Sequence, residues 1–469
     1  MEPGEYARLD ATGLRALIAR GDVDVAEVDA VARVAIAKAN TVVNGLAQPL
    51  FDTGLAHSAD GPFGGVPFLL KDGPMADGVE FSLGSRSLNG IRARHDSDLM
   101  RRFRAAGLVA LGVTTMPELG LSFATEPARS GPTRNPWDLA RGVGGSSGGA
   151  AAMVAMGAVP VAHANDAAGS IRVPAACCGL VGLKPSRGRT PCGPDAGDPA
   201  FGGVADFVVT RTVRDAAGLL DAVHGPGVGD KYTAPPPARC YAAELTVAPE
   251  RLRVAISTRS WSGGTVDADV AAVAERVGLF FAELGNPVIN ADPGLDWDDV
   301  VHAVMAESIA IAAPFLTAPR RPDPARMEAV SRQILAEADG MSAMDLMRML
   351  DAQNRVSRRI GAFFTDHDLL ITPTLACLPP PHGTLSSDRP GHTLESWLRS
   401  LFDVGPFTAP FNVGGQPAIS MPLGHSESGL PIGVQLVAGY GRDGLLLRVA
   451  AELERAMPWA ERVAPDAIG

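Results

Sequence analysis

The sequence predicts an α/β protein, in which buried strands alternate with helices. The apolar residues 66–70 have the length and the flanking turn residues of a buried strand. A helix is predicted at about 98–106 and is followed at once by the apolar run LVALGV at 108–113. Farther on, a predicted helix that ends near Gly157 precedes a strand that begins near Val159. Such alternation is typical of a sheet covered by helices.

The remaining segments fit the same class. Residues 10–40 predict two helices, and the second, capped by Asp24 with Glu27 three residues later, extends to about Lys38. Residues 210–223 predict an amphipathic helix after a short strand, and the strand DLLITPT begins at Asp368. From 267 to 364 helical periodicity dominates. Within that stretch a stripe of apolar residues predicts core packing; its members are Met341, Met344, Met347 and Leu350.

Composition and charge limit the classes of function. The chain has 469 residues, 46% of them apolar and 20% charged, which is typical of a globular protein with a large core. Its net charge of −11 argues against nucleic acid as a partner. The start, MEPGEYARLD, lacks the basic and apolar regions of a secretory signal, so we expect a cytoplasmic protein. The five cysteines and nine histidines show no metal-ligand spacing, so no metal or cofactor is predicted.

The most distinctive segment, residues 142–174, reads GVGGSSGGAAAMVAMGAVPVAHANDAAGSIRVP. Two loops that contain serine flank a 13-residue apolar run, which is too short and too interrupted by Gly and Pro to cross a membrane. A phosphate-binding loop would need a lysine after Gly148 or Gly149, and none is there. A G-x-S-x-G nucleophile elbow is matched at Ser146 and at Ser147, but an elbow follows a buried strand, whereas the preceding RNPWDLARGV is polar and turn-forming. The third interpretation joins the serines to a distant lysine.

That lysine is Lys71, at the end of the predicted strand 66–70. Only four of the 41 basic residues are lysine, so this chain usually has arginine where a plain positive charge suffices. Burial disfavours the ammonium form, and a lysine, unlike an arginine, can then lose its proton and act as a base. The alternative is a lysine whose ammonium group reaches solvent from the strand end.

Several motifs decide between these interpretations. GGSSGG, small residues and D-x-x-G-S-I-R-x-P-A span Gly144 to Ala175, and VPFLLKD places Lys71 75 residues before Ser146. With CGLVGLKPSRGR and QPAISMPLG…GLPIGVQLVA, they cover most of the chain. By these motifs the sequence resembles the amidase signature family of serine hydrolases. Within it, HANDAAGSIR and PFNVGGQPAISMPLG resemble bacterial amidases of the 6-aminohexanoate-cyclic-dimer hydrolase type.

The resemblance implies a fold and a set of roles. It implies one domain over 1–469, a large mixed β-sheet with helices on both faces, although length alone suggests roughly three domains of about 150 residues. Residues from about 225 to 365 would be a variable, mainly helical region on the substrate side. Lys71 resembles the base, Ser146 the bridging serine held by a cis peptide bond, and Ser170 the nucleophile. The backbone N–H groups expected to form the oxyanion hole belong to Ala167, Ala168, Gly169 and Ser170, and the residues expected to brace the loop are Ser147, Asp166 and Arg172.

These roles agree with elementary chemistry. A serine hydroxyl becomes a strong nucleophile when a base takes its proton, and backbone N–H groups in a loop of small residues can stabilise an oxyanion. Some residues depart from the family's pattern. Relatives commonly have Thr and Gly at Ala167 and Ala168, Asn at Gly73, and Lys and Asn at the positions of Val113 and Thr115. Substrate preference therefore cannot be transferred from relatives.

The sequence accordingly predicts an amidase, a hydrolase of non-peptide C–N bonds, with a small-molecule amide as substrate and an acyl-enzyme on Ser170. Aryl, aliphatic and cyclic amides and esters all remain open, as does a homodimer. Two alternatives are kept. One is the A subunit of a tRNA-dependent amidotransferase, which shares the Ser-Ser-Lys chemistry, and the other is an inactive binding protein on the same fold.

Overall fold

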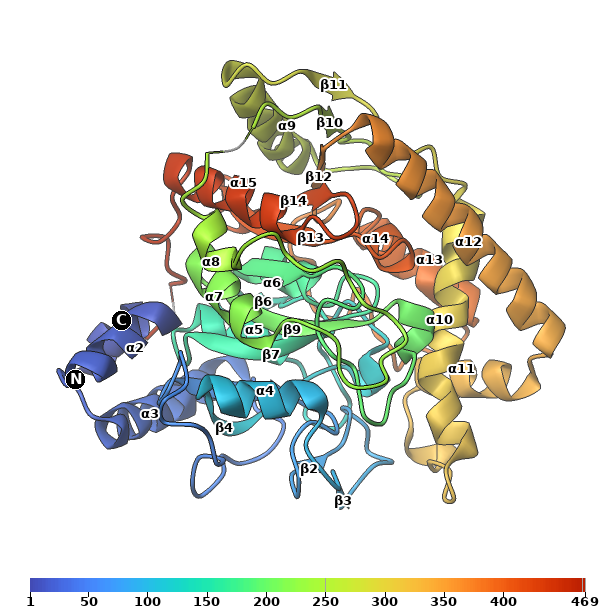
Figure 1. Ribbon diagram of the computed structural model, residues 1–469. Helices are drawn as coiled ribbons and strands as arrows, with labels where there is room; N and C mark the ends of the chain where they lie inside the picture. The colour runs from blue at the N-terminus through green and yellow to red at the C-terminus, as the bar shows by residue number, and fades with distance from the viewer. Residues whose placement is uncertain (249, 466, 469) are drawn as a thin grey trace.

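The computed structural model describes residues 1–248, 250–465 and 467–468, and over these it is built around one ten-stranded mixed sheet (Figure 1). The strand order is β11-β10-β12-β14-β13-β8-β9-β7-β1-β4. In chain order these strands are β1 (Pro67–Lys71), β4 (Val109–Thr114), β7 (Val161–Asp166), β8 (Val181–Lys184), β9 (Ala205–Thr210), β10 (Val254–Ile256), β11 (Val288–Asn290), β12 (Leu369–Pro373), β13 (Ala418–His425) and β14 (Pro431–Ala438).

The helices cover both faces of this sheet. In chain order the α-helices are α1 (Pro3–Arg8), α2 (Ala11–Arg20), α3 (Val25–Val43), α4 (Asp98–Ala106), α5 (Gly148–Ala155), α6 (Arg172–Cys178), α7 (Val213–Val223), α8 (Tyr241–Glu244), α9 (Ala268–Glu283), α10 (Trp297–Thr317), α11 (Ala329–Gly340), α12 (Ala343–Asp366), α13 (Leu394–Val404), α14 (Pro410–Val413) and α15 (Asp443–Ala456). Helix α5 contacts both α3 and α6, whereas α7 contacts α4, α8 and α15. The predicted α/β class with a mixed sheet is confirmed.

Strand direction places the candidate residues together. β1 runs parallel to both β4 and β7, while β7 pairs antiparallel with β9. The carboxyl ends of parallel neighbours lie at the same edge of a sheet, so the residues that end β1 and β7, Lys71 and Asp166, lie at one edge. Most side chains of both strands are fully buried, as their apolar sequences predict.

Helices α10, α11 and α12 gather beside the sheet, at the right of Figure 1. By length and composition α10 could span a membrane, but half of it is buried within the protein, and it packs against α11, α12 and α13. The core helix of a soluble protein passes the same test, so packing accounts for its apolar character. The segment 225–365 is mainly helical, yet it also supplies β10 and β11 to the main sheet.

Most predicted elements are confirmed, several to within a few residues. The helix capped by Asp24 begins there, with the carboxylate accepting from Glu27 N at 2.7 Å, but it continues to Val43 rather than Lys38. The helix at 98–106 is α4, and its N-cap is Ser97. The segment before the serine loop is not a plain turn, because it forms a hairpin of β5 (Arg134–Asn135) and β6 (Asp138–Gly142).

The predicted core role of the apolar stripe is confirmed for Met341 and Leu350, which pack partly buried against the core, and is wrong for Met344 and Met347. Met344 and Met347 are 63% and 53% exposed on the outer side of α12. The face of α12 that is buried against the protein carries Met349, Ala352, Val356, Ile360 and Phe363. The predicted stripe and the buried face both follow the spacing of a helix, so only the packing of neighbouring helices decides which of the two is covered.

Candidate active site

A cavity of about 480 Å³ brings the candidate residues together at the edge where β1 and β7 end. Lys71, Ser146 and Ser170 all line it, although they are widely separated in the sequence. Its apolar wall includes residues that follow β1 and residues at the end of α10, among them Met75, Phe81, Leu83, Ile311 and Phe315. A pocket of this size with a few polar groups on one side is typical of a small-molecule site.

Lys71 is buried, with 2% of its surface exposed. Its Nζ lies 2.7 Å from Ser146 Oγ and 2.9 Å from Ser147 Oγ, and it also donates to Asn165 Oδ1. Burial lowers the pKa of Lys71 to about 7, and the nearby carboxylates of Asp206, Asp166 and Asp72 offset only part of that effect. The alternative of an ammonium group reaching solvent is therefore wrong.

The hydrogen bonds of Ser147 distinguish it from Ser146. Ser147 Oγ donates its single proton to the backbone carbonyl of Asn165 at 3.2 Å, so toward Lys71 it can only accept. A neutral amine has two N–H donors and one lone pair, and Asn165 Oδ1 and Ser147 Oγ occupy the two donors. The lone pair is then left for the hydroxyl of Ser146, which follows a cis Gly145–Ser146 peptide bond.

Ser170 lies in the turn between β7 and α6, and 5% of its surface is exposed. Among the described residues its hydroxyl has no hydrogen-bond partner, so no bond to Ser146 is present. Its carbonyl oxygen accepts from Ser147 N at 3.3 Å, which ties the two serine loops together.

The backbone N–H groups of residues 167–170 are free of intramolecular bonds within the described part of the chain. Two side chains bind carbonyl groups at this loop. Asn412 Nδ2 donates to Asp166 O at 2.8 Å, and Thr408 Oγ1 donates to Ala168 O at 2.6 Å. In a trans peptide the N–H points opposite to the C=O. The N–H groups of Ala167 and Gly169 therefore point away from Asn412 and Thr408, neither of which lines the cavity.

Gly169 fits this turn because it lacks a Cβ. Its φ is +146°, a region that other residues rarely adopt, and a Cβ there would lie 2.6 Å from Thr408 Oγ1. The hydroxyl of Thr408 can approach the loop closely only because residue 169 is glycine. Asn412 belongs to the motif PFNVGGQPAISMPLG and Thr408 to no motif, and no local pattern joins either residue to the loop, which lies more than 230 residues away.

Asp166 and Arg172 form an ion pair that is fully buried, not a surface pair. Arg172 Nε and Nη2 donate to the two carboxylate oxygens at 2.9 and 2.8 Å, and Ile171 N also donates to Asp166 at 3.1 Å. Burial alone would raise the pKa of Asp166, but the charge of Arg172 outweighs it and holds the pKa at about 2. Arg172 also donates to three partners near the chain's end, Thr408 O, Asn412 Oδ1 and Gln435 Oε1.

The departures from the family's pattern do not all face the cavity. Gly73 and Ala167 line it. Val113 and Thr115 are buried elsewhere, and the Thr115 hydroxyl lies 2.7 Å from the Thr133 hydroxyl. Thr115 nevertheless lies close to the serine loop, because its carbonyl oxygen accepts from Gly149 N at 3.2 Å.

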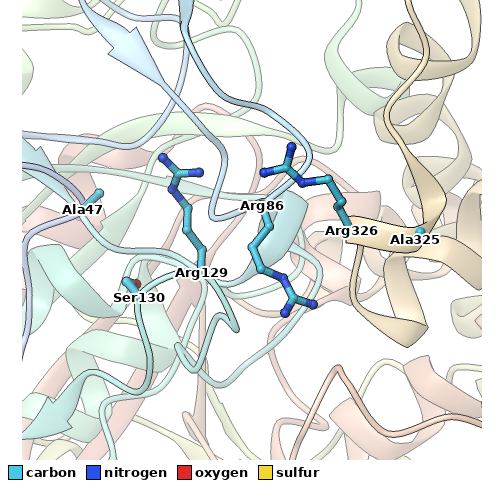
Figure 2. Close-up of a pocket in the computed structure, with 6 residues that line it drawn as sticks. All are labelled: Ala47, Arg86, Arg129, Ser130, Ala325 and Arg326. Atoms are coloured by element: carbon cyan, nitrogen blue, oxygen red, sulfur yellow. The ribbon is translucent and has the colours of Figure 1, made fainter.

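A second cavity has a volume of about 490 Å³. Arg86 and Arg129 from the first half of the chain and Arg326 from the second half line it (Figure 2). Figure 2 shows the side chains of Arg129 and Arg326 extending the same way, while that of Arg86 extends in the opposite direction. The guanidinium group of Arg129 already donates to Ser85 O and to Asn89. The three charges do not converge on one point, and the described residues that line this cavity include no pair of nucleophile and base.

No metal site emerges from the described residues, in which no three His, Cys, Asp or Glu side chains are grouped to hold an ion. Cys177 and Cys178 are free cysteines buried in α6.

The chain is similar to known proteins over almost its whole length. The family model described as Amidase matches residues 26–447. The 6-aminohexanoate-cyclic-dimer hydrolase of Paenarthrobacter ureafaciens is 38% identical, and that of Pseudomonas sp. (strain NK87) is 39% identical; each alignment covers 97% of this chain and 96% of the relative. A solved structure of 6-aminohexanoate cyclic dimer hydrolase complexed with substrate superposes with a TM-score of 0.91 at 37% identity, covering 98% of this chain and 99% of that one.

Proposed function

Since the chain belongs to the amidase family, we propose that it hydrolyses the C–N bond of small-molecule amides, linear or cyclic, through a Ser-Ser-Lys triad. In this triad Lys71 is the base, Ser146 the bridging serine and Ser170 the nucleophile. The observation that carries the proposal is the buried lysine with a lowered pKa, bonded to Ser146 in a cavity that Ser170 also lines.

The reaction begins with proton transfer. Neutral Lys71 takes the proton of Ser146, which takes that of Ser170, and Ser170 Oγ attacks the amide carbon. The C=O π electrons move to oxygen and form a tetrahedral oxyanion. When the carbonyl re-forms, the C–N bond breaks, and the relay in reverse delivers the proton to the leaving nitrogen. An ester to Ser170 remains.

Water then completes the cycle. The relay removes a proton from the water as its oxygen attacks the ester carbon, and collapse of the second tetrahedral intermediate returns the proton to Ser170 Oγ. The products are a carboxylic acid and an amine or ammonia. The relay needs Ser146 and Ser170 to become hydrogen-bonded, a contact that we expect to form when substrate is bound, since catalytic contacts often tighten in the complex.

The loop of residues 167–170 is the proposed oxyanion hole. Its support is the set of free backbone N–H groups, aimed by Asn412 and Thr408, next to the proposed nucleophile. Ser147, Asp166 and Arg172 brace that loop in this proposal, through the contacts with Asn165, Ile171 and the chain's end described above. The cytoplasmic location, the single-domain division and a homodimer stay predictions.

The region of about 225–365 is proposed as the substrate side of the molecule. Ile311, Pro314 and Phe315, all from α10, line the cavity opposite the strand ends. Side chains on such a covering helix can change without disturbing the sheet that carries the triad, so they can set which amide is accepted.

A panel of amides tests the proposed function. Purified protein is incubated with linear aryl and aliphatic amides and with 6-aminohexanoate cyclic dimer, the compound in the relatives' names, and released amine or ring-opened product is measured. We expect turnover of at least one class, lost in Ser170→Ala. If folded protein turns over no amide, or if Ser170→Ala retains full activity, the proposal is wrong.

A further inference from the structure

The cavity beside the proposed triad carries an unusual balance of charge. Its lining includes three carboxylates, Asp72, Asp195 and Asp206, but one basic side chain, Lys71, which must be neutral to act as a base. None of the 37 arginines lines it, within the residues that the structure describes. The field inside the cavity therefore favours positive charge and disfavours negative charge.

Two of the three carboxylates are already hydrogen-bonded or screened by solvent. Asp72 accepts from Ser82 N, Ser82 Oγ and Gly84 N at 2.6–3.0 Å, which occupies both of its oxygens. The side chain of Asp195 is 71% exposed and lies 3.2 Å from His95 Nε2, so water and a neighbour reduce its field.

Asp206 differs from both. It is the direct cross-strand partner of Asn165, the residue whose amide oxygen accepts from Lys71, so its side chain lies on the same face of the sheet. Its carboxylate is 22% exposed, and it accepts no hydrogen bond that meets ordinary geometry within the described chain. A partly buried carboxylate without such bonds is available to pair with a cationic group.

His163 lies beside one carboxylate oxygen of Asp206. Lys71 N donates to His163 Nδ1 at 3.3 Å, so the neutral ring carries its proton on Nε2. That Nε2 lies 3.3 Å from Asp206 Oδ1, while the ring itself is 2% exposed. This contact involves one carboxylate oxygen of Asp206, so the other oxygen remains available to a ligand.

From this arrangement we infer that the enzyme prefers amides that carry a protonated amino group, and that Asp206 is the residue that binds this group. The inference rests on the proposed amidase function and names the substrate class for the same cavity. It also accounts for product release, because hydrolysis creates a carboxylate inside a cavity whose field repels it.

Two matched series of substrates test it. In the first, the acyl chain of a p-nitroanilide is 6-aminohexanoyl, heptanoyl or 5-carboxypentanoyl, so similar chains end in a cation, a methyl group or an anion. In the second, N-acetylated amines of five or six carbons end in the same three groups. For the wild type we expect kcat/KM in at least one series to be about tenfold higher for the cation than for the methyl analogue, and to be lowest for the anion. A factor of about ten lies between the effect of an exposed ion pair and that of a fully buried one. The preference should shrink as salt is raised.

The variants Asp206→Asn and Asp195→Asn show which of the two carboxylates binds the cationic group. Because loss of a charge near Lys71 affects every substrate alike, the ratio of kcat/KM between cationic and neutral substrates isolates binding of the cation. Asp206→Asn should reduce that ratio to about one, and Asp195→Asn should change it less than twofold, as expected for an exposed charge. Loss of the preference in Asp195→Asn instead, or equal rates for all three wild-type substrates in both series, overturns the inference while leaving the amidase function standing. Absence of turnover for every substrate counts against the amidase function itself.

Discussion

The pH dependence of Lys71 gives the most quantitative prediction. A lysine with the ordinary pKa of about 10.4 is neutral in roughly one molecule of 2,500 at pH 7. Burial lowers the pKa of Lys71 to about 7, so about half of the molecules carry the free base. The cavity thus raises the supply of neutral base by about 10³-fold.

Lys71→Arg removes that supply while keeping positive charge and approximate length. The guanidinium pKa lies above about 12, so at pH 7 fewer than about one molecule in 10⁵ could accept a proton. We expect Lys71→Arg to lose at least about 10³-fold in kcat, as does Lys71→Ala, while both stay folded by circular dichroism. The bulkier guanidinium adds to the loss through misplacement.

The assay is amine release followed from pH 5 to 10. The base must be neutral, so kcat/KM should rise with pH through a midpoint near 7 and then level off. Asp206 contributes the largest of the charges that raise the pKa of Lys71, so Asp206→Asn should move that midpoint to lower pH. Near-wild-type turnover in a folded Lys71→Arg variant would refute the reasoning, as would a wild-type profile that is flat across this range.

Three further predictions follow from the contacts. Ser146→Ala should lose at least about 10²-fold in kcat because the relay is broken, whereas Ser147→Ala should lose less, since that hydroxyl only accepts from Lys71; equal losses would contradict the assignment. Thr408→Val should lower kcat by about 10-fold or more with KM little changed, because the Gly169 N–H is no longer aimed, and Thr408→Ser should restore most of it; a KM effect alone, or no rescue by serine, would count against this role. Arg172→Met should cost about 3–5 kcal/mol of unfolding free energy in urea by leaving a buried carboxylate unpaired, while Arg321→Met, from an exposed pair, should cost below about 1 kcal/mol; similar midpoints for the two variants would contradict the buried pair's importance.

The sequence predicted those parts of the fold that local patterns determine. Short apolar runs predicted β1 and β4, and α4 was found at its predicted bounds. Helix α3 continues beyond Lys38, because the residues that follow, through Val43, still carry buried positions. The stripe of Met344 and Met347 was misassigned, because periodicity gives the angle between side chains on a helix and not which face a neighbour covers.

The site was predictable where motifs carry it and not where distant segments meet. Lys71, Ser146 and Ser170 were singled out by the sequence, and the fold brings them to one cavity. The orientation of the 167–170 loop depends on Thr408 and Asn412, which no local pattern joins to it. Likewise the exposure of Asp206 to the cavity depends on the antiparallel register of β7 and β9, a tertiary property.

The identity of the nucleophile is the central claim, and labelling by a fluorophosphonate tests it most directly. The probe reacts with an activated serine and leaves a stable phosphonate ester, which peptide mapping by mass spectrometry assigns to one residue. The account predicts one adduct, on Ser170, absent from Ser170→Ala and strongly reduced in Lys71→Arg. An adduct on Ser146 or Ser147 in the wild-type protein would contradict it.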